Sequence, residues 1–83
     1  MAYNVQYKQS VARDLSRLDR REARLLLDKI EKELHTHPDH YPSLKGPFEG
    51  LRKMRMGDYR VIYALLGQDV LILRIGHRRD VYR

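Results

Sequence analysis

Several features are absent from this sequence, and each absence narrows what the chain can be. It has no cysteine, so it forms no disulfide and no thiolate metal site, which fits a reducing compartment. No apolar stretch approaches the length of a membrane span, and the first residues lack the charged-then-apolar layout of a signal peptide. We therefore expect a soluble, cytoplasmic protein with no membrane partner.

The sequence also lacks the motifs of the commonest enzyme mechanisms. It has no Gly-rich phosphate loop, no evident serine nucleophile and no pair of carboxylates spaced as a general acid and base. The histidines His35, His37 and His40 lie close together, but no cysteine accompanies them, so we interpret them as solvated loop side chains in preference to zinc ligands. We predict neither a metal nor a cofactor.

The chain is short and basic. Its 83 residues are enough for one domain, near the size at which a single core only just holds a fold. Lysine and arginine outnumber aspartate and glutamate by 17 to 11, which gives a formal charge of +6 and a pI of about 9.9. A polyanionic partner, either nucleic acid or an acidic protein, fits this charge, and so does a basic surface kept for solubility.

The last third of the chain predicts an antiparallel meander of three strands. Gly-Asp at 57–58, between two alternating runs, indicates a two-residue turn of type II′, which places Arg55 opposite Arg60. At the second turn we expect a three-residue loop, 67–69, because it gathers the apolar side chains on one face. That face would hold Met54, Met56, Tyr59, Val61, Tyr63, Leu65, Leu71, Leu73 and Ile75.

The first half of the chain predicts a strand and two helices. Residues 3–7 alternate apolar and polar, with Tyr3, Val5 and Tyr7 on the core side. Ser10 can cap a short helix, and Asp19 can cap a second helix that runs to about residue 35. The apolar stripe of the second helix is Ala23, Leu26, Leu27, Ile30 and Leu34.

These elements predict an α+β fold. Prolines at 38 and 42 end the second helix and open a loop to about residue 50. The order is then an N-terminal strand, a helical hairpin and the three-stranded meander. We expect a four-stranded sheet with both helices on its apolar face.

The other sheet face should be cationic. Like charges directly across a hairpin are destabilising, so Arg55 opposite Arg60 suggests a bound anion, for which arginine's bidentate fork is suited. The cations and polar groups that this face and the chain after it could present are Lys53, Arg55, Arg60, Arg74, His77, Arg78, Arg79 and Tyr82. A solvated basic face, or pairing with nearby aspartates, is the alternative.

Cations on a rigid sheet are compatible with metal-free RNA cleavage. In that reaction a ribose 2′-hydroxyl attacks the neighbouring phosphate, and the protein orients the RNA, stabilises the developing negative charge and moves protons. His77 could serve as a general base, or it could be only a polar residue at a strand end.

Three stretches carry a recognisable signature. They are residues 44–46, residues 50–63 with the run Gly-Asp-Tyr-Arg-Val-Ile-Tyr, and residues 75–82 with the run Gly-His-Arg-Arg. Together with the first strand and the helices, they resemble the RelE/ParE superfamily of toxins over nearly the whole chain. The resemblance implies a single toxin domain, 1–83, of a toxin–antitoxin pair, and RelE-type members cut messenger RNA in the ribosomal A site.

The resemblance also implies roles for individual residues. The catalytic set would be Lys53, Arg55, Arg60, Arg78 and Tyr82, and Arg74, His77 and Arg79 would bind RNA. The cations would hold and polarise the scissile phosphate, while Tyr82 would stack on a base or assist proton transfer. Arg55 stands where some RelE members have lysine, which keeps the charge but makes a poorer proton carrier.

The implied partners are an antitoxin, the ribosome and messenger RNA. We expect the antitoxin to carry an acidic or amphipathic segment that covers the basic surface. ParE members share the scaffold, lack the full cationic set and inhibit DNA gyrase. A gyrase inhibitor, or a binding module without catalytic activity, is therefore the alternative to an endoribonuclease.

Overall fold

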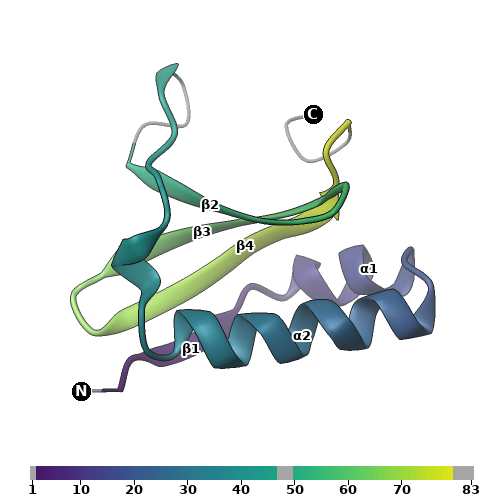
Figure 1. The fold of residues 1–83 in the computed structure, drawn as a ribbon, viewed down its shortest axis with the longest axis horizontal. Coiled ribbons are helices and arrows are strands. Elements are labelled where there is room, and N and C mark those ends of the chain that lie inside the picture. The colour runs from purple at the N-terminus through teal and green to yellow at the C-terminus, as the bar shows by residue number, and fades with distance from the viewer. Residues whose placement is uncertain (1, 47–49, 80–83) are drawn as a thin grey trace.

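The computed structural model describes residues 2–46 and 50–79 (Figure 1). In chain order its elements are β1 (Asn4–Tyr7), α1 (Ser10–Ser16), α2 (Arg20–Leu34), the 3-10 helix η1 (Pro38–His40), β2 (Leu51–Met56), β3 (Tyr59–Leu66) and β4 (Asp69–His77). This order is the strand, helical hairpin and meander that the sequence predicts, and the α+β class is confirmed.

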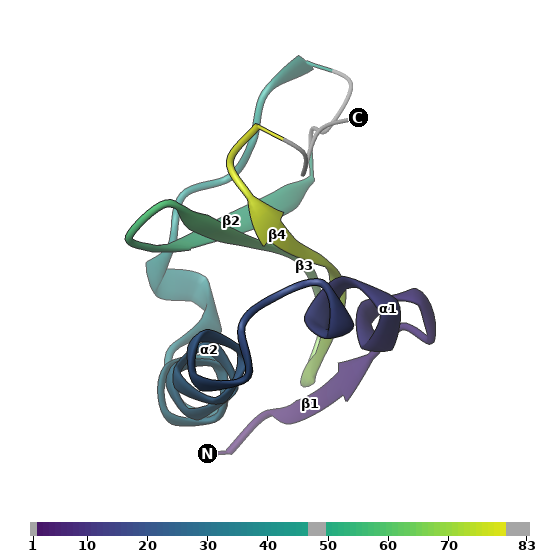
Figure 2. The ribbon, with the colours of Figure 1, turned by 90° about the vertical axis from the view of Figure 1, so that its right-hand side faces the viewer.

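The strands form one sheet with the order β1-β4-β3-β2. The meander is antiparallel, while β1 pairs parallel with β4 and so lies at the opposite edge from β2. Figures 1 and 2 show α1 and α2 on the same side of this sheet. We call that side the helix face and the other side the outer face.

The core fills the space between the helices and the helix face. From α2 it takes Leu26, Ile30 and Leu34, which recur every four residues and so share one stripe. The sheet contributes Met54, Val61, Tyr63, Val70, Ile72 and Ile75. In the part of the chain that the structure describes, no helix is both long and apolar enough to span a bilayer.

The first hairpin has the predicted register. Gly57 has a φ of 60°, the left-handed value that a type II′ turn requires at its first loop position. Arg55 pairs with Arg60, and Lys53 pairs with Ile62. The local sequence therefore specified this hairpin correctly.

The second turn was predicted incorrectly. It is a two-residue turn, 67–68, that pairs Leu66 with Asp69, and a β-bulge follows at Leu73, between the pairs Tyr63–Ile72 and Ile62–Arg74. The bulge adds to β4 the one residue that a three-residue loop would have added to the turn. Both halves of β4 therefore still turn apolar side chains to the helices. As a result Val70 and Ile72 are buried in place of Leu71 and Leu73.

The helix starts also differ in detail from the sequence prediction. Ser10 is the first helical residue, so Gln9 takes the N-cap position of α1, without a side-chain cap bond. Asp19 is the N-cap of α2 as predicted, but its side chain makes no cap hydrogen bond. The packing of Val11 and Leu15 against the core, rather than a cap, accounts for the position of α1.

The segment after α2 is more ordered than the predicted loop. The buried hydroxyl of Tyr63 donates a hydrogen bond to the carbonyl of Pro38 in η1, and burial raises the pKa of Tyr63. Ser43 forms an isolated bridge with Arg52, so this segment pairs with the edge of β2. It thereby protects a strand edge that would otherwise be open.

Candidate functional site

The cations of the meander share the outer face in two rows. Arg55, Arg60 and Gly76 are aligned across β2, β3 and β4, and Gly76 adds no side chain to that row. In the next row Lys53 aligns with Ile62 and Arg74. We call Lys53, Arg55 and Arg60 the cationic cluster.

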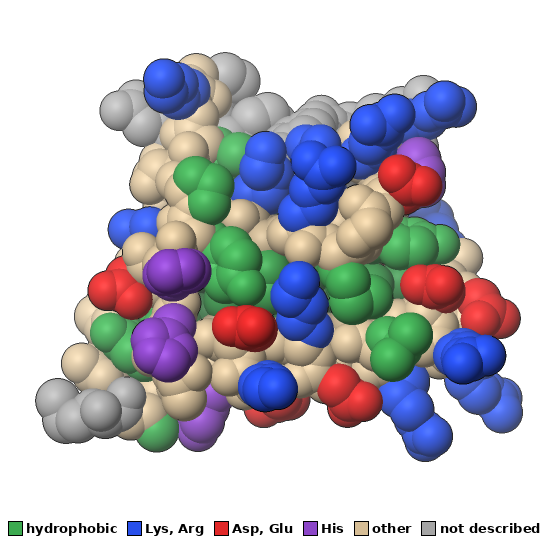
Figure 3. All heavy atoms as spheres, in the orientation of Figure 1, with side chains coloured by type: hydrophobic (Ala, Val, Ile, Leu, Met, Phe, Trp, Pro, Cys, Tyr) green, Lys and Arg blue, Asp and Glu red, His purple; other side chains and the backbone are tan. Residues whose placement is uncertain are grey.

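No described helix covers the outer face, which lies on the far side of the sheet from α1 and α2 (Figures 1 and 2). Figure 3, in the orientation of Figure 1, shows several Lys and Arg side chains in the upper part of the molecule, away from the helices, and others in its lower part. Arg55 is exposed, while Lys53 and Arg60 are half-buried. The rest of the outer face is more apolar, with Leu51, Ala64 and Leu71 in one row.

Two hydrogen bonds connect the β2–β3 hairpin, which carries the cationic cluster, to other elements. The Arg78 amide donates to the carbonyl of Asp58 at 2.8 Å, which brings the chain after β4 against the β2–β3 turn. The Lys29 ammonium of α2 donates to the carbonyl of Arg55 at 3.1 Å. The fold therefore places the backbone of Arg78 beside the hairpin that carries Arg55 and Arg60.

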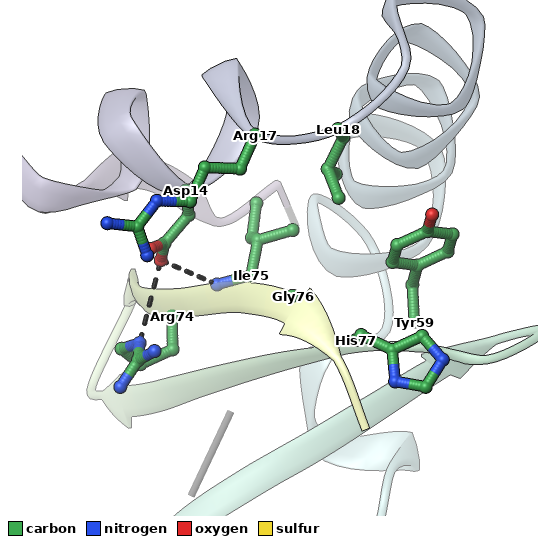
Figure 4. A pocket seen from close by; sticks show the side chains of 8 residues that line it. All are labelled: Asp14, Arg17, Leu18, Tyr59, Arg74, Ile75, Gly76 and His77. Carbon is green, nitrogen blue, oxygen red and sulfur yellow. Dashed lines mark hydrogen bonds and ion pairs between the residues drawn. The ribbon is translucent and has the colours of Figure 1, made fainter. Parts of the chain in front are cut away.

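Arg74 belongs to the outer face by register but pairs with α1. Its Nε lies 3.6 Å from Oδ2 of Asp14, and the same oxygen accepts a hydrogen bond from the amide of Ile75 at 3.0 Å. Figure 4 shows both interactions, and the three residues line a hollow of about 160 Å³ together with Arg17. Arg74, which the sequence predicts to bind RNA, therefore already forms an ion pair with Asp14 in this structure.

His77 lies on the other face of the sheet from the cationic cluster. It pairs with Tyr59, and the two rings meet edge to face with centroids 6.0 Å apart. The Arg79 amide donates to Nδ1 of His77 at 3.3 Å, so in the neutral ring Nε2 carries the proton. His77 thus lies at the end of β4 on the helix face, and its role as a general base or as a polar strand-end residue stays a prediction.

The structure thus brings together only part of the predicted site. Lys53, Arg55 and Arg60 share one face, the backbone of Arg78 lies beside them, and Arg79 is exposed just beyond. Tyr82 lies outside the described residues. Sequence reasoning missed Asp14, Arg17 and Lys29, because nothing in their local pattern distinguishes them from other charged helix residues.

The described residues contain no group of three or more histidine, cysteine, aspartate or glutamate side chains that could hold a metal ion. Nδ1 of His37 lies 2.9 Å from the hydroxyl of Thr36, and His40 packs edge-on against Tyr41. His37 and His40 thus each contact a neighbouring residue of the same segment.

Comparisons of the sequence with known proteins identify its relatives. Residues 5–82 match a family described as the ParE toxin of the type II toxin–antitoxin system parDE. A Mycobacterium tuberculosis protein named Toxin RelE is 34% identical over 84 residues, covering 98% of this chain and 87% of that protein. Toxin RelG of the same organism is 30% identical over 86 residues, covering 100% and 99%.

Solved structures share the fold. A chain from the RelBE2 toxin–antitoxin complex of M. tuberculosis has a TM-score of 0.87 at 27% identity and covers 94% of this chain and 100% of that one. A chain from the archaeal RelE–RelB complex of Pyrococcus horikoshii has a TM-score of 0.73 at 26% identity and covers 98% and 100%. The likeness therefore extends over nearly the full length of both chains.

Proposed function

This chain belongs to the ParE toxin family of type II toxin–antitoxin systems, and we propose that it is a RelE-like endoribonuclease that cuts messenger RNA on the ribosome and so inhibits translation. Relatives named Toxin RelE and Toxin RelG support the RelE-like assignment. The proposal places the protein in the cytoplasm, where the ribosomes are.

The observation that carries the proposal is the pairing of Arg55 with Arg60 on a sheet face that no described helix covers. Arg55 and Arg60 are facing residues of like charge, which is destabilising, and an RNA phosphate bound by both guanidiniums would replace this repulsion with charge-assisted hydrogen bonds. Lys53 stands two residues before Arg55 on the same face, so it can contact the same phosphate or the next one.

The proposed reaction needs no metal. The ribose 2′-oxygen forms a bond to the adjacent phosphorus as the bond from phosphorus to the 5′-oxygen breaks, which leaves a 2′,3′-cyclic phosphate and a free 5′-hydroxyl. Arg55, Arg60 and Arg78 would stabilise the charge that develops on the phosphate oxygens, because arginine is effectively always protonated and carries no proton away.

Proton transfer therefore falls to other groups. The 2′-hydroxyl must lose a proton and the leaving 5′-oxygen must gain one. Of the proposed set, Lys53 and Tyr82 can exchange protons, and Tyr82 would alternatively stack on a base. Of the other residues predicted to bind RNA, Arg79 would bind neighbouring phosphates. Arg74 and His77 would support the end of β4 through their contacts with Asp14 and Tyr59.

Primer extension on messenger RNA from translating ribosomes tests the proposal. We expect new RNA ends within ribosome-bound codons when the protein is added, and none with Arg60→Ala. Cleavage of ribosome-free RNA alone, or no cleavage by the folded protein, would overturn it.

A second candidate function is inhibition of DNA gyrase. The observation in its favour is the family match, since the matching family is described as ParE. A DNA supercoiling assay separates the two candidates: a gyrase inhibitor blocks supercoiling and leaves ribosome-bound RNA intact, and the nuclease does the reverse.

We further propose a cognate antitoxin as the physiological partner. Two structurally similar chains come from toxin–antitoxin complexes. An antitoxin segment with acidic or amphipathic character would fit the basic outer face and silence it.

A further inference from the structure

The edge of β4 is covered by two different elements along its length. β1 pairs with it only as far as Tyr7 and Ile72, while β4 continues to His77. Val61, opposite Ile75, turns its backbone polar groups toward β2 in the two-residue hairpin, so the Ile75 amide points to the open edge. A strand edge left open in this way exposes backbone donors that need partners.

Asp14 of α1 takes the place that a further strand residue would occupy. Its Oδ2 accepts the Ile75 amide at 3.0 Å and lies 3.6 Å from Nε of Arg74, as Figure 4 shows. The Asp14 side chain is only 10% exposed, so its charge is largely removed from water and depends on these two partners. One carboxylate thus binds α1 to two successive residues of β4.

The two anchored residues immediately precede the functional segment. Gly76 aligns with Arg55 and Arg60, and the Arg78 amide is held from the other side by the carbonyl of Asp58. The chain from Gly76 to Arg79 is therefore held between α1 and the β2–β3 turn. Loss of either contact, that of Asp14 with Ile75 or that of Arg78 with Asp58, would change the position of Arg78 relative to the cationic cluster.

We propose that Asp14 is a positioning residue, whose carboxylate fixes the end of β4 so that Arg78 and the cationic cluster act on one phosphate. The inference rests on the proposed nuclease function, which it deepens. Asp14 acts through Ile75 and Arg74 and does not itself touch RNA. A carboxylate on the RNA-binding surface would repel phosphate, whereas one carried by α1, turned to β4 and largely buried organises the cations at little cost in affinity.

A positioning role predicts that loss of the Asp14 carboxylate lowers the cleavage rate without weakening RNA binding. Asp14→Ala removes a negative charge beside Arg74, so RNA should bind as well as before or more tightly. The cleavage rate should nevertheless fall, because a displacement of about 1 Å can cost on the order of a hundredfold. A carboxylate that only supported folding would not lower kcat at constant KM in the folded fraction.

The experiment measures ribosome-dependent cleavage and amide hydrogen exchange for matched variants. We expect Asp14→Ala to lower kcat at least tenfold with KM unchanged or lower, and to speed exchange at Ile75. Asp14→Asn keeps an oxygen that can accept the Ile75 amide, so it should recover most of kcat and of the protection. Asp28→Ala, at an exposed carboxylate of α2, makes the same charge change and should behave as wild type.

Several outcomes would overturn the proposal. They are wild-type kcat in folded Asp14→Ala, a rise in KM with kcat unchanged, or an equal loss in Asp28→Ala. If Asp14→Ala does not fold, Asp14→Glu replaces it: the longer side chain keeps the charge but pushes the strand end away, and a wild-type kcat in that variant refutes the positioning role.

The failure of the nuclease proposal would look different. A folded wild-type protein that cuts no ribosome-bound RNA refutes the proposed function whatever Asp14 does. Amide hydrogen exchange then tests separately whether Asp14 fixes the end of β4. Faster exchange at Ile75 and His77 in Asp14→Ala supports this positioning role, and unchanged exchange overturns it.

Discussion

Arg55 on β2 lies directly opposite Arg60 on β3, in the register that the two-residue turn at 57–58 imposes. Counting outward from the turn, this is a non-hydrogen-bonded pair, the kind in which facing side chains come closest. The protein therefore carries two cationic side chains on facing residues of its outer face, an arrangement that a bound phosphate would stabilise.

Neutralising one member of this pair should raise the stability of the protein and lower its activity. We expect Arg55→Gln to raise the free energy of unfolding by about 0.2 to 1 kcal/mol, the scale of a cross-strand pair. The cleavage rate should fall on the order of a hundredfold, as for loss of one preorganised charge at a reacting phosphate. Urea unfolding and ribosome-dependent cleavage of the same protein check both. A variant that is less stable yet equally active would contradict the role of Arg55.

Removing the third-strand cation should abolish toxicity without unfolding the domain. Arg60→Ala leaves the apolar core intact, so soluble expression and circular dichroism should match wild type while growth arrest disappears. Arg78→Ala should behave likewise. Arg24→Ala, at an exposed arginine of α2, changes net charge equally and should remain toxic. Growth arrest by Arg60→Ala at equal expression would contradict the prediction.

A charge on the helix face should unfold the protein instead. Val61 is fully buried, so Val61→Asp places a carboxylate in the core at a cost of several kcal/mol. Leu66→Asp is the matched control on the same strand, because Leu66 is 61% exposed and tolerates a polar group. Thermal unfolding should show a cooperative transition for the control and none for Val61→Asp.

The hydroxyl of Tyr63 should make stability depend on pH in the alkaline range. Burial raises the pKa of Tyr63, with the Arg52 guanidinium acting in the opposite direction, so the folded state favours the neutral phenol. This contribution is complete below the unfolded pKa of about 10 and is lost as pH rises through the folded-state pKa.

Tyr63→Phe should remove that alkaline loss. It should also lower stability near neutral pH by about 1 to 2 kcal/mol, because the buried carbonyl of Pro38 loses its donor. The measurement is the free energy of unfolding of both proteins from pH 8 to 11. Parallel curves would show that Tyr63 does not titrate differently in the two states.

Antitoxin binding should weaken with salt. If an acidic segment covers the cationic cluster, raising ionic strength from about 0.05 to 0.5 M should reduce affinity severalfold, because exposed charges are screened over a shorter distance. Titration calorimetry at both concentrations measures this. Equal affinity would instead indicate contact with the apolar row of Leu51, Ala64 and Leu71.

The sequence determined those parts of the structure that depend on neighbours along the chain. Glycine at 57, with its left-handed φ, and alternation on both sides of it specify the first hairpin and hence the alignment of Arg55 with Arg60. The spacing of Leu26, Ile30 and Leu34 similarly determined α2 and the side it buries. Each is a local signal, readable within a few residues.

Tertiary structure decided the features that join distant segments. The bulge at Leu73 exists because both ends of β4 must turn apolar side chains to the same helices, a constraint that no single turn reveals. Asp14 and Ile75 are 61 residues apart, and their hydrogen bond forms only because β1 stops short of the end of β4 and α1 lies against the remaining edge. His77 lies on the face opposite the cationic cluster because it continues β4 beyond Ile75 and pairs with Tyr59 across the sheet.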